Sequence, residues 1–151
     1  SKINYCGMKT EEEKIKIILE KKIFLLGELE SQTKKQSKAI DENDVPLLVE
    51  VLEAKEGVIA SLVKDDEEFD QCVMCLNDTD RKIIVENFKE YGARIETETK
   101  KIIEIENDCE RKLINEKKDL LLKMRSLKNG RTLLKGYGLS ARIKPKISGS
   151  I

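Results

Sequence analysis

Residues 11–128 contain almost no helix breakers, and this feature constrains the fold more than any other. Pro46 is the only proline in the interval, and its only glycines are Gly27, Gly57 and Gly92. The remainder is rich in Glu, Lys, Leu and Ile, which favour helices, and 38% of the whole chain is charged. Apolar residues recur in steps of three and four, so each helix has one apolar face. The sequence predicts an all-α protein.

Turn-forming residues divide this interval into three helices. They are expected at about residues 11–40, 45–69 and 79–128. In the first link, an Asp or Asn side chain of Asp41–Asp44 caps the second helix, and Pro46 lies in the first helical turn, where its missing N–H breaks no bond. In the second link, Asp78 or Thr79 is the expected cap. The short first link predicts an antiparallel hairpin.

The third helix is expected to be about 50 residues long, or ~75 Å. Its stripe alternates steps of four and three: Ile84, Phe88, Tyr91, Ile95, Glu98, Ile102, Ile105, Cys109, Leu113, Glu116, Leu120, Met124 and Leu127. The predicted architecture is an elongated antiparallel three-helix coiled-coil bundle with one very long C-terminal helix. Because the first two helices cover only part of the third, one of its ends is expected to project and to present its apolar stripe to a partner.

Two features qualify the predicted packing. Glu98 and Glu116 occupy core-like positions, and they are expected either to lie at the rim of the bundle or to limit self-association. Each of the three internal glycines costs about 1 kcal/mol relative to alanine, and we interpret them as points of close helix approach.

The predicted organisation has three parts. Residues 1–10 are expected to be disordered or derived from an expression tag, residues 11–128 form the bundle, and residues 129–151 form a basic, flexible tail. Eight basic residues and no acidic ones follow Asp119, whereas the first 119 residues hold 21 basic and 29 acidic side chains. The zero net charge of the chain therefore conceals an acidic body and a basic C-terminal end.

Composition and motifs argue against an enzyme. Histidine is absent, which excludes Ser-His-Asp and Cys-His catalysis and histidine-ligated metals. Cys72-Val-Met-Cys75 has C-x-x-C spacing, but a zinc site needs four ligands and a thioredoxin-like motif needs a βαβ unit, so we interpret it as part of the apolar cover of the hairpin end. There is no phosphate-binding loop or nucleophile elbow. We expect no enzymatic activity, cofactor, metal site or small-molecule substrate.

Targeting signals are also lacking. Charged residues interrupt every candidate signal-peptide core, and no stretch approaches the length of a membrane span. Four cysteines without a secretion signal favour free thiols in a reducing compartment. The sequence therefore predicts a cytoplasmic protein that does not insert into membranes.

Three stretches resemble the flagellar type III export chaperones of the FlgN/FliT kind, and FlgN-like members in particular. The stretch 36–44, QSKAIDEND, is similar to the family's hairpin turn. Residues 55–62, KEGVIASL, followed by Asp65, Asp66 and Phe69, resemble its second helix. The segment 129–137, NGRTLLKGY, is similar to the N-G-R-x-A-L-x-G-Y segment that closes these proteins. The resemblance covers roughly residues 11–138, and Lys64 departs from its pattern because a hydrophobic residue usually precedes the Asp.

This resemblance implies a cytoplasmic chaperone that binds the helical ends of hook–filament junction or related flagellar subunits and delivers them to the export apparatus. In FlgN-like members the C-terminal helical region contacts the client. Carried onto this chain, the implied partner-binding residues are Leu120, Met124, Leu127, Arg131, Leu134 and Tyr137. The residue pattern marks the same stretch independently, because the projecting stripe and the change to basic charge both lie there.

Two other interpretations remain open. The chain could be a structural coiled-coil scaffold or homodimer with no role in secretion. Less favoured is nucleic-acid binding through the tail, because the tail has a single aromatic residue for stacking and the acidic body repels a polyanion.

Overall fold

Five helices account for nearly all of the chain that the structure describes, and no strand occurs among those residues. The structure, a computed structural model, describes the backbone of residues 2–126 and the side chains from Thr10 to Ser126. The helices are α1 (Lys2–Asp41), α2 (Val45–Met74), α3 (Asp78–Asn87), α4 (Lys89–Asn115) and α5 (Lys118–Ser126). The predicted all-α class is therefore confirmed.

Helix α1 begins at Lys2, nine residues before its predicted start. The backbone of residues 2–10 is thus helical, although these residues were expected to be disordered or tag-derived. The stretch has no proline, and Gly7 lowers helix propensity by only about 1 kcal/mol without preventing helical hydrogen bonds. The helix extends through this segment because nothing in it stops a helix that is already formed.

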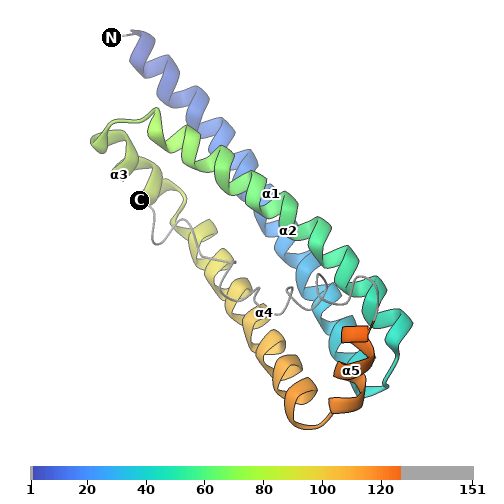
Figure 1. Ribbon diagram of the computed structural model, residues 1–151. Coiled ribbons are helices and arrows are strands. Elements are labelled where there is room, and N and C mark those ends of the chain that lie inside the picture. Colours follow the sequence, from blue (N-terminus) through green and yellow to red (C-terminus); the bar gives the residue numbers. More distant parts are fainter. Residues whose placement is uncertain (1, 127–151) are drawn as a thin grey trace.

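The link between α1 and α2 has the predicted turn chemistry. Asn43 has a positive φ of 55°, which asparagine tolerates better than most residues. The Asp44 carboxylate caps α2 by accepting a hydrogen bond from the Leu47 N–H at 3.1 Å, and Pro46 lies in the first turn. These local features turn the chain into the α1–α2 hairpin seen in Figure 1.

The second link is shorter than expected because α2 continues to Met74 and leaves only residues 75–77 as the connection. The cap of α3 is Asn77, one residue before the predicted Asp78. Its side-chain oxygen accepts a hydrogen bond from the Asp80 N–H at 2.8 Å. Asn and Asp cap helices about equally well, so propensity alone does not distinguish the two positions.

The predicted continuous third helix is not confirmed, because the run is divided at two places. The first division is a kink at Phe88, whose backbone leaves the helical region (φ −110°, ψ 20°). Hydrogen bonds from Phe88 N to Ile84 O and from Gly92 N to Phe88 O, at 3.0 and 3.1 Å, span the kink. Helices α3 and α4 are therefore two bent parts of one helical run.

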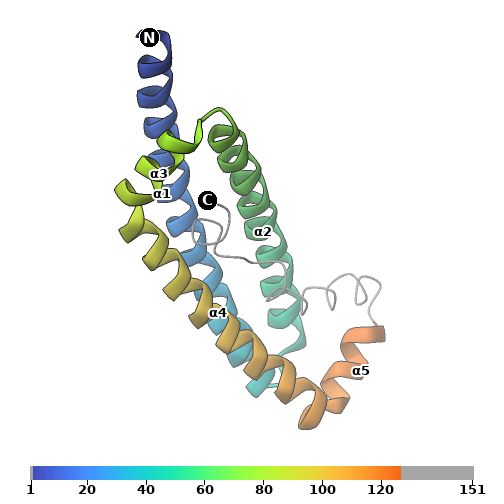
Figure 2. The same ribbon diagram turned by 90° about the vertical axis from the view of Figure 1, so that its left-hand side faces the viewer.

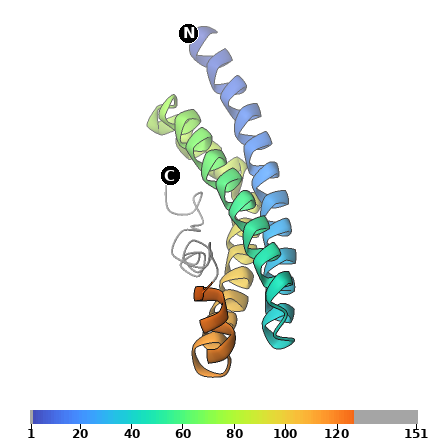
Figure 3. The same cartoon turned by 45° about the vertical axis from the view of Figure 1, so that its right-hand side comes forward.

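The second division, after Asn115, reverses the direction of the chain. Lys117 N bonds to Lys112 O at 2.8 Å, one residue further back than in an α-helix, and α5 then turns back beside the end of α4 (Figures 1 and 3). Glu116 is exposed at this point. A straight helix would carry Leu120 and Met124 beyond the hairpin into solvent. The reversal instead buries both, each worth roughly 1.5–3 kcal/mol.

Helix α1 packs against both α2 and α4, and Figure 2 shows it between them. The buried apolar side chains form two clusters. The larger runs from Ile15 on α1 to Ile102 on α4. The smaller lies at the closed end of the hairpin and joins Ala39 and Ile40 to residues of α2, α4 and α5.

The internal glycines of the hairpin do not mark close packing. A Cβ added at Gly27 or Gly57 would meet no atom within 4 Å. Our interpretation of these two positions as close helix approaches is therefore wrong.

Candidate functional site

The described part of the predicted partner-binding stretch lies inside the protein's own core. Leu120 and Met124 project from α5 and are buried. They pack in the smaller cluster with Ala39, Ile40, Leu48, Leu52, Cys109 and Leu113. The other four predicted residues, Leu127, Arg131, Leu134 and Tyr137, lie outside the described residues. A partner therefore reaches Leu120 and Met124 only when α5 leaves the end of the hairpin.

The opposite face of α5 is exposed in its present position. Leu122 is 59% exposed, and the neighbouring Lys123 and Arg125 give this last described helix a basic end. The sequence stripe omitted Leu122 because it falls off the line that joins Leu120 to Met124. Helix α5 thus has one apolar face on the core and a large apolar residue on its outer side.

A buried polar layer joins the three long helices. Lys55 of α2 is 1% exposed, and its ammonium donates hydrogen bonds to Gln36 Oε1 of α1 and to Glu106 Oε1 of α4. All three side chains are buried. A single lysine of α2 therefore reaches both α1 and α4 at this level of the core.

The layer is electrostatically costly. Burial lowers the pKa of Lys55 to about 7, against the smaller opposing influence of Cys109 and Glu56. Within the described part of the chain, no hydrogen-bond partner reaches Gln36 Nε2 or Glu106 Oε2. We expect such a layer to specify which helices meet, and in which register, more than it stabilises them.

The sequence did not reveal this layer. The steps of three and four in the second predicted helix include Lys55, but the stripe of the third helix assigned the adjacent Ile105 in place of Glu106. Likewise, Thr99 is buried where Glu98 was placed on the core line, while Glu98 lies at the rim as expected. At each of these two positions the predicted apolar stripe is therefore one residue too early in the sequence.

Further along the hairpin, two lysines of α1 face two aspartates of α2. Lys22 Nζ lies 2.8 Å from Asp66 Oδ1, and Lys21 Nζ lies 3.4 Å from Asp65 Oδ1. The Asp65 side chain is buried, and burial raises its pKa despite the nearby Lys21. These pairs connect α1 to α2 beside a pocket on the outside of the hairpin, which is called the outer pocket below.

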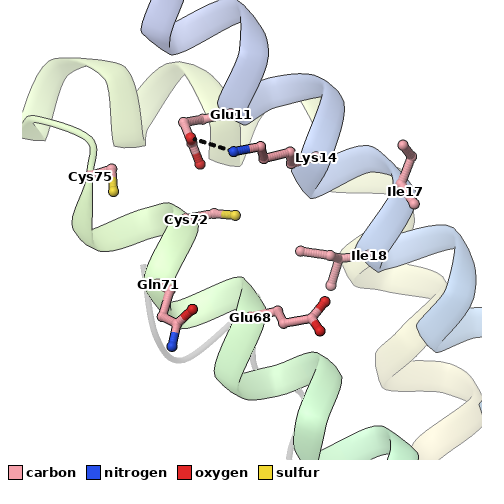
Figure 4. Close-up of a pocket in the computed structure, with 8 residues that line it drawn as sticks. All are labelled: Glu11, Lys14, Ile17, Ile18, Glu68, Gln71, Cys72 and Cys75. Atoms are coloured by element: carbon pink, nitrogen blue, oxygen red, sulfur yellow. Dashed lines mark hydrogen bonds and ion pairs between the residues drawn. The ribbon is translucent and has the colours of Figure 1, made fainter.

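That outer pocket, drawn in Figure 4, lies between the first half of α1 and the end of α2. It has a volume of about 450 Å³ and is lined by Glu11, Lys14, Ile17, Ile18, Glu68, Gln71, Cys72 and Cys75. Glu11 and Lys14 form an ion pair at 3.3 Å across its upper side. Ile17 at its edge and Phe24 two turns further along α1 are each 65% exposed.

The two cysteines of the C-x-x-C motif both line this pocket but differ in environment. Cys72 is buried and Cys75 is exposed, and both are free thiols. Burial, and then a hydrogen bond to Glu11, raise the pKa of the Cys72 thiol to about 11. Their neighbours Val73 and Leu76 are buried in the larger cluster, as expected of a cover for the hairpin end, whereas Met74 is exposed.

The described residues contain no group of three or more His, Cys, Asp or Glu side chains placed to hold a metal ion. None of the described helices has both the length and the apolar composition needed to cross a bilayer. The exposed apolar residues of this part of the chain include Leu122 on the outer side of α5 and Ile17 at the edge of the outer pocket.

Comparison of the chain with family models, curated proteins and solved structures finds no match.

Proposed function

We propose that this protein is a cytoplasmic chaperone of the flagellar export type. It binds the helical ends of hook–filament junction or related flagellar subunits before type III secretion and presents them to the export apparatus. The proposal includes coiled-coil packing of the long helices. It assigns the protein no enzymatic activity, cofactor or small-molecule substrate.

The observation that carries the proposal is the position of α5. This helix of nine residues is the last one described, and it covers an apolar cluster with two buried side chains, Leu120 and Met124. It immediately precedes the stretch of the chain that resembles the closing segment of the chaperones. A short helix over an apolar cluster is an element that an incoming amphipathic helix can exchange with or pack beside.

In this mechanism α5 leaves the hairpin end and uses Leu120 and Met124 against the client helix. Exposing these two side chains costs roughly 3–6 kcal/mol, which the client contacts must offset. Clients with an amphipathic end meet this requirement, because their apolar face buries the same kind of surface. The basic residues Lys123 and Arg125 favour an acidic rim on the client helix.

The experiment uses the full chain and purified hook–filament junction subunits from the same source, with affinity measured by isothermal titration calorimetry. The double variant Leu127→Asp/Leu134→Asp is expected to abolish binding, with the helical circular dichroism signal and melting temperature nearly unchanged. Ile114→Asp, an exposed position on α4, is the matched control and is expected to bind as the unmodified chain does.

Wild-type affinity in the double variant would refute the proposed binding stretch. If the unmodified chain binds none of the subunits, the chaperone function itself fails. A stable homodimer in sedimentation, combined with no subunit binding, would support the scaffold interpretation instead.

A further inference from the structure

The C-x-x-C motif lies at the end of α2, where helix geometry brings its two residues together. Residues three apart in an α-helix have Cα atoms about 5 Å apart, inside the ~4.4–6.8 Å range that a disulfide spans. Their Cβ atoms, at about 5–6 Å, are further apart than the ~3.5–4.5 Å of a disulfide. Bridging Cys72 and Cys75 therefore requires a small tightening of the last turn and no larger movement.

The end of α2 has the freedom for this tightening. Helix α2 ends at Met74, and Cys75 is its C-cap residue. Leu76 N already bonds to Val73 O at 3.0 Å, the three-residue spacing of a tighter helix. The sulfur of Cys72 points across the pocket toward α1 and that of Cys75 points elsewhere (Figure 4), so Cys75 must rotate its exposed side chain.

The two thiols also differ in access. Cys75 is exposed and meets a dissolved oxidant directly. Cys72 is 9% exposed, and burial raises the pKa of its thiol. Cys72 lies one turn before Cys75. It is therefore placed to attack the Cys75 sulfur after Cys75 has formed a mixed disulfide.

We propose that Cys72 and Cys75 form a reversible disulfide by exchange with a small disulfide of the glutathione class. The Cys75 thiolate attacks one sulfur of glutathione disulfide, forms a mixed disulfide and releases one glutathione thiolate. Cys72 then loses its proton to solvent, and its thiolate attacks the Cys75 sulfur, forms the internal S–S bond and releases the second glutathione as a thiolate. Two protein thiols are oxidised while one glutathione disulfide is reduced to two thiols.

Formation of this bond draws the Cys72 sulfur, which lines the pocket between α1 and α2, toward Cys75. Oxidised Cys72 has no S–H to donate, whereas Glu11 keeps Lys14 as its partner. Because the regular helix must tighten to form it, the disulfide is strained and easily reduced, as regulatory disulfides are. The site is therefore a redox-sensitive modification site at the open end of the hairpin, distant from the α5 surface.

The test treats the whole chain with glutathione disulfide in a Cys6→Ser background, so that this additional cysteine does not compete for the reagent. After alkylation of the remaining thiols, intact and peptide masses are measured. Trypsin releases residues 65–81 as one peptide that contains both motif cysteines, and it leaves Cys109 in another. The expected product is this peptide lacking two hydrogen atoms, restored by mild reduction. Cys72→Ser is expected to accumulate a glutathione adduct on Cys75, and Cys75→Ser to react at least tenfold more slowly.

Circular dichroism of each variant establishes that it is folded. A persistent glutathione adduct on Cys75 in the Cys6→Ser background, with no internal disulfide, would overturn the proposal. Equal reaction rates of Cys75→Ser and Cys72→Ser would also overturn it, because Cys75 would then not be the entry point. Because the readout is a mass and involves no client, its failure is independent of the proposed chaperone function.

Discussion

Replacing Lys55 by methionine tests the energetic role of the buried polar layer. Methionine preserves most of the apolar stem but removes the ammonium that serves both Gln36 and Glu106. Removing one partner of a buried ion pair typically costs ~3–5 kcal/mol, because the remaining charge is left uncompensated. That is a large fraction of the ~5–15 kcal/mol that stabilises an ordinary domain. We therefore expect Lys55→Met to lose about 3–5 kcal/mol at neutral pH.

The assay is urea unfolding followed by circular dichroism, with Lys64→Met as the matched control. Lys64 is an exposed lysine on the same helix, so its replacement is expected to change the free energy of unfolding by at most about 0.5 kcal/mol. The double variant Lys55→Met/Glu106→Leu removes both charges and is expected to recover most of the loss or to exceed the unmodified chain. Equal stability of Lys55→Met and Lys64→Met would refute the reasoning.

The pH dependence supplies a second check with a defined sign. In the folded chain the pKa of Lys55 is lowered to about 7 from an ordinary value of 10.5, so the unfolded chain binds more protons between these values. Its contribution to the free energy of unfolding therefore rises with pH across that window. In Lys55→Met this rise is absent. The difference in the free energy of unfolding between the unmodified chain and Lys55→Met should therefore grow from pH 7 upward. A constant difference would show that Lys55 is not the group with the lowered pKa.

Two further substitutions test the packing. Met124→Ala removes a fully buried side chain from the smaller cluster and is expected to cost about 2–5 kcal/mol in urea unfolding, whereas Leu122→Ala, on the outer side of α5, is expected to cost little. An equal effect of the two would contradict the burial of one face of α5. Gly57→Ala adds a methyl group to open space and is expected to stabilise the protein by about 0.5–1 kcal/mol, with Ala60→Gly on the same helix destabilising it by a similar amount. A loss of stability in Gly57→Ala would show that the position is crowded.

The features that local chemistry determines could be predicted from the sequence. The Asp44 cap and Pro46 identified the hairpin link, because both act within one helical turn of themselves. The reversal after Asn115 could not be predicted in this way, since Glu116 and Lys117 are good helix formers. It depends on the burial of Leu120 and Met124 against residues 72 or more positions earlier, such as Ala39 and Leu48.

The candidate site was predicted less well for a related reason. The heptad pattern assigns each helix one face, but it does not indicate which polar residue on that face finds a partner across the core. Glu106 became a core residue only because Lys55 of another helix meets it there. Leu120 and Met124 were placed correctly on the apolar face of their helix, yet the same apolar character allows them to pack internally.

The separation of Lys55 and Glu106 along the chain also sets an order of events during synthesis. These partners are 51 positions apart, and ribosomes add about 5–20 residues per second, so Glu106 is made roughly 3–10 s after Lys55. Within that time the α1–α2 hairpin is complete in sequence, and Lys55 has Gln36 but no carboxylate to accept its charge. In the nascent hairpin, Lys55 therefore stays in contact with water until α4 has been synthesised. The core can close only when this third long helix has left the ribosome.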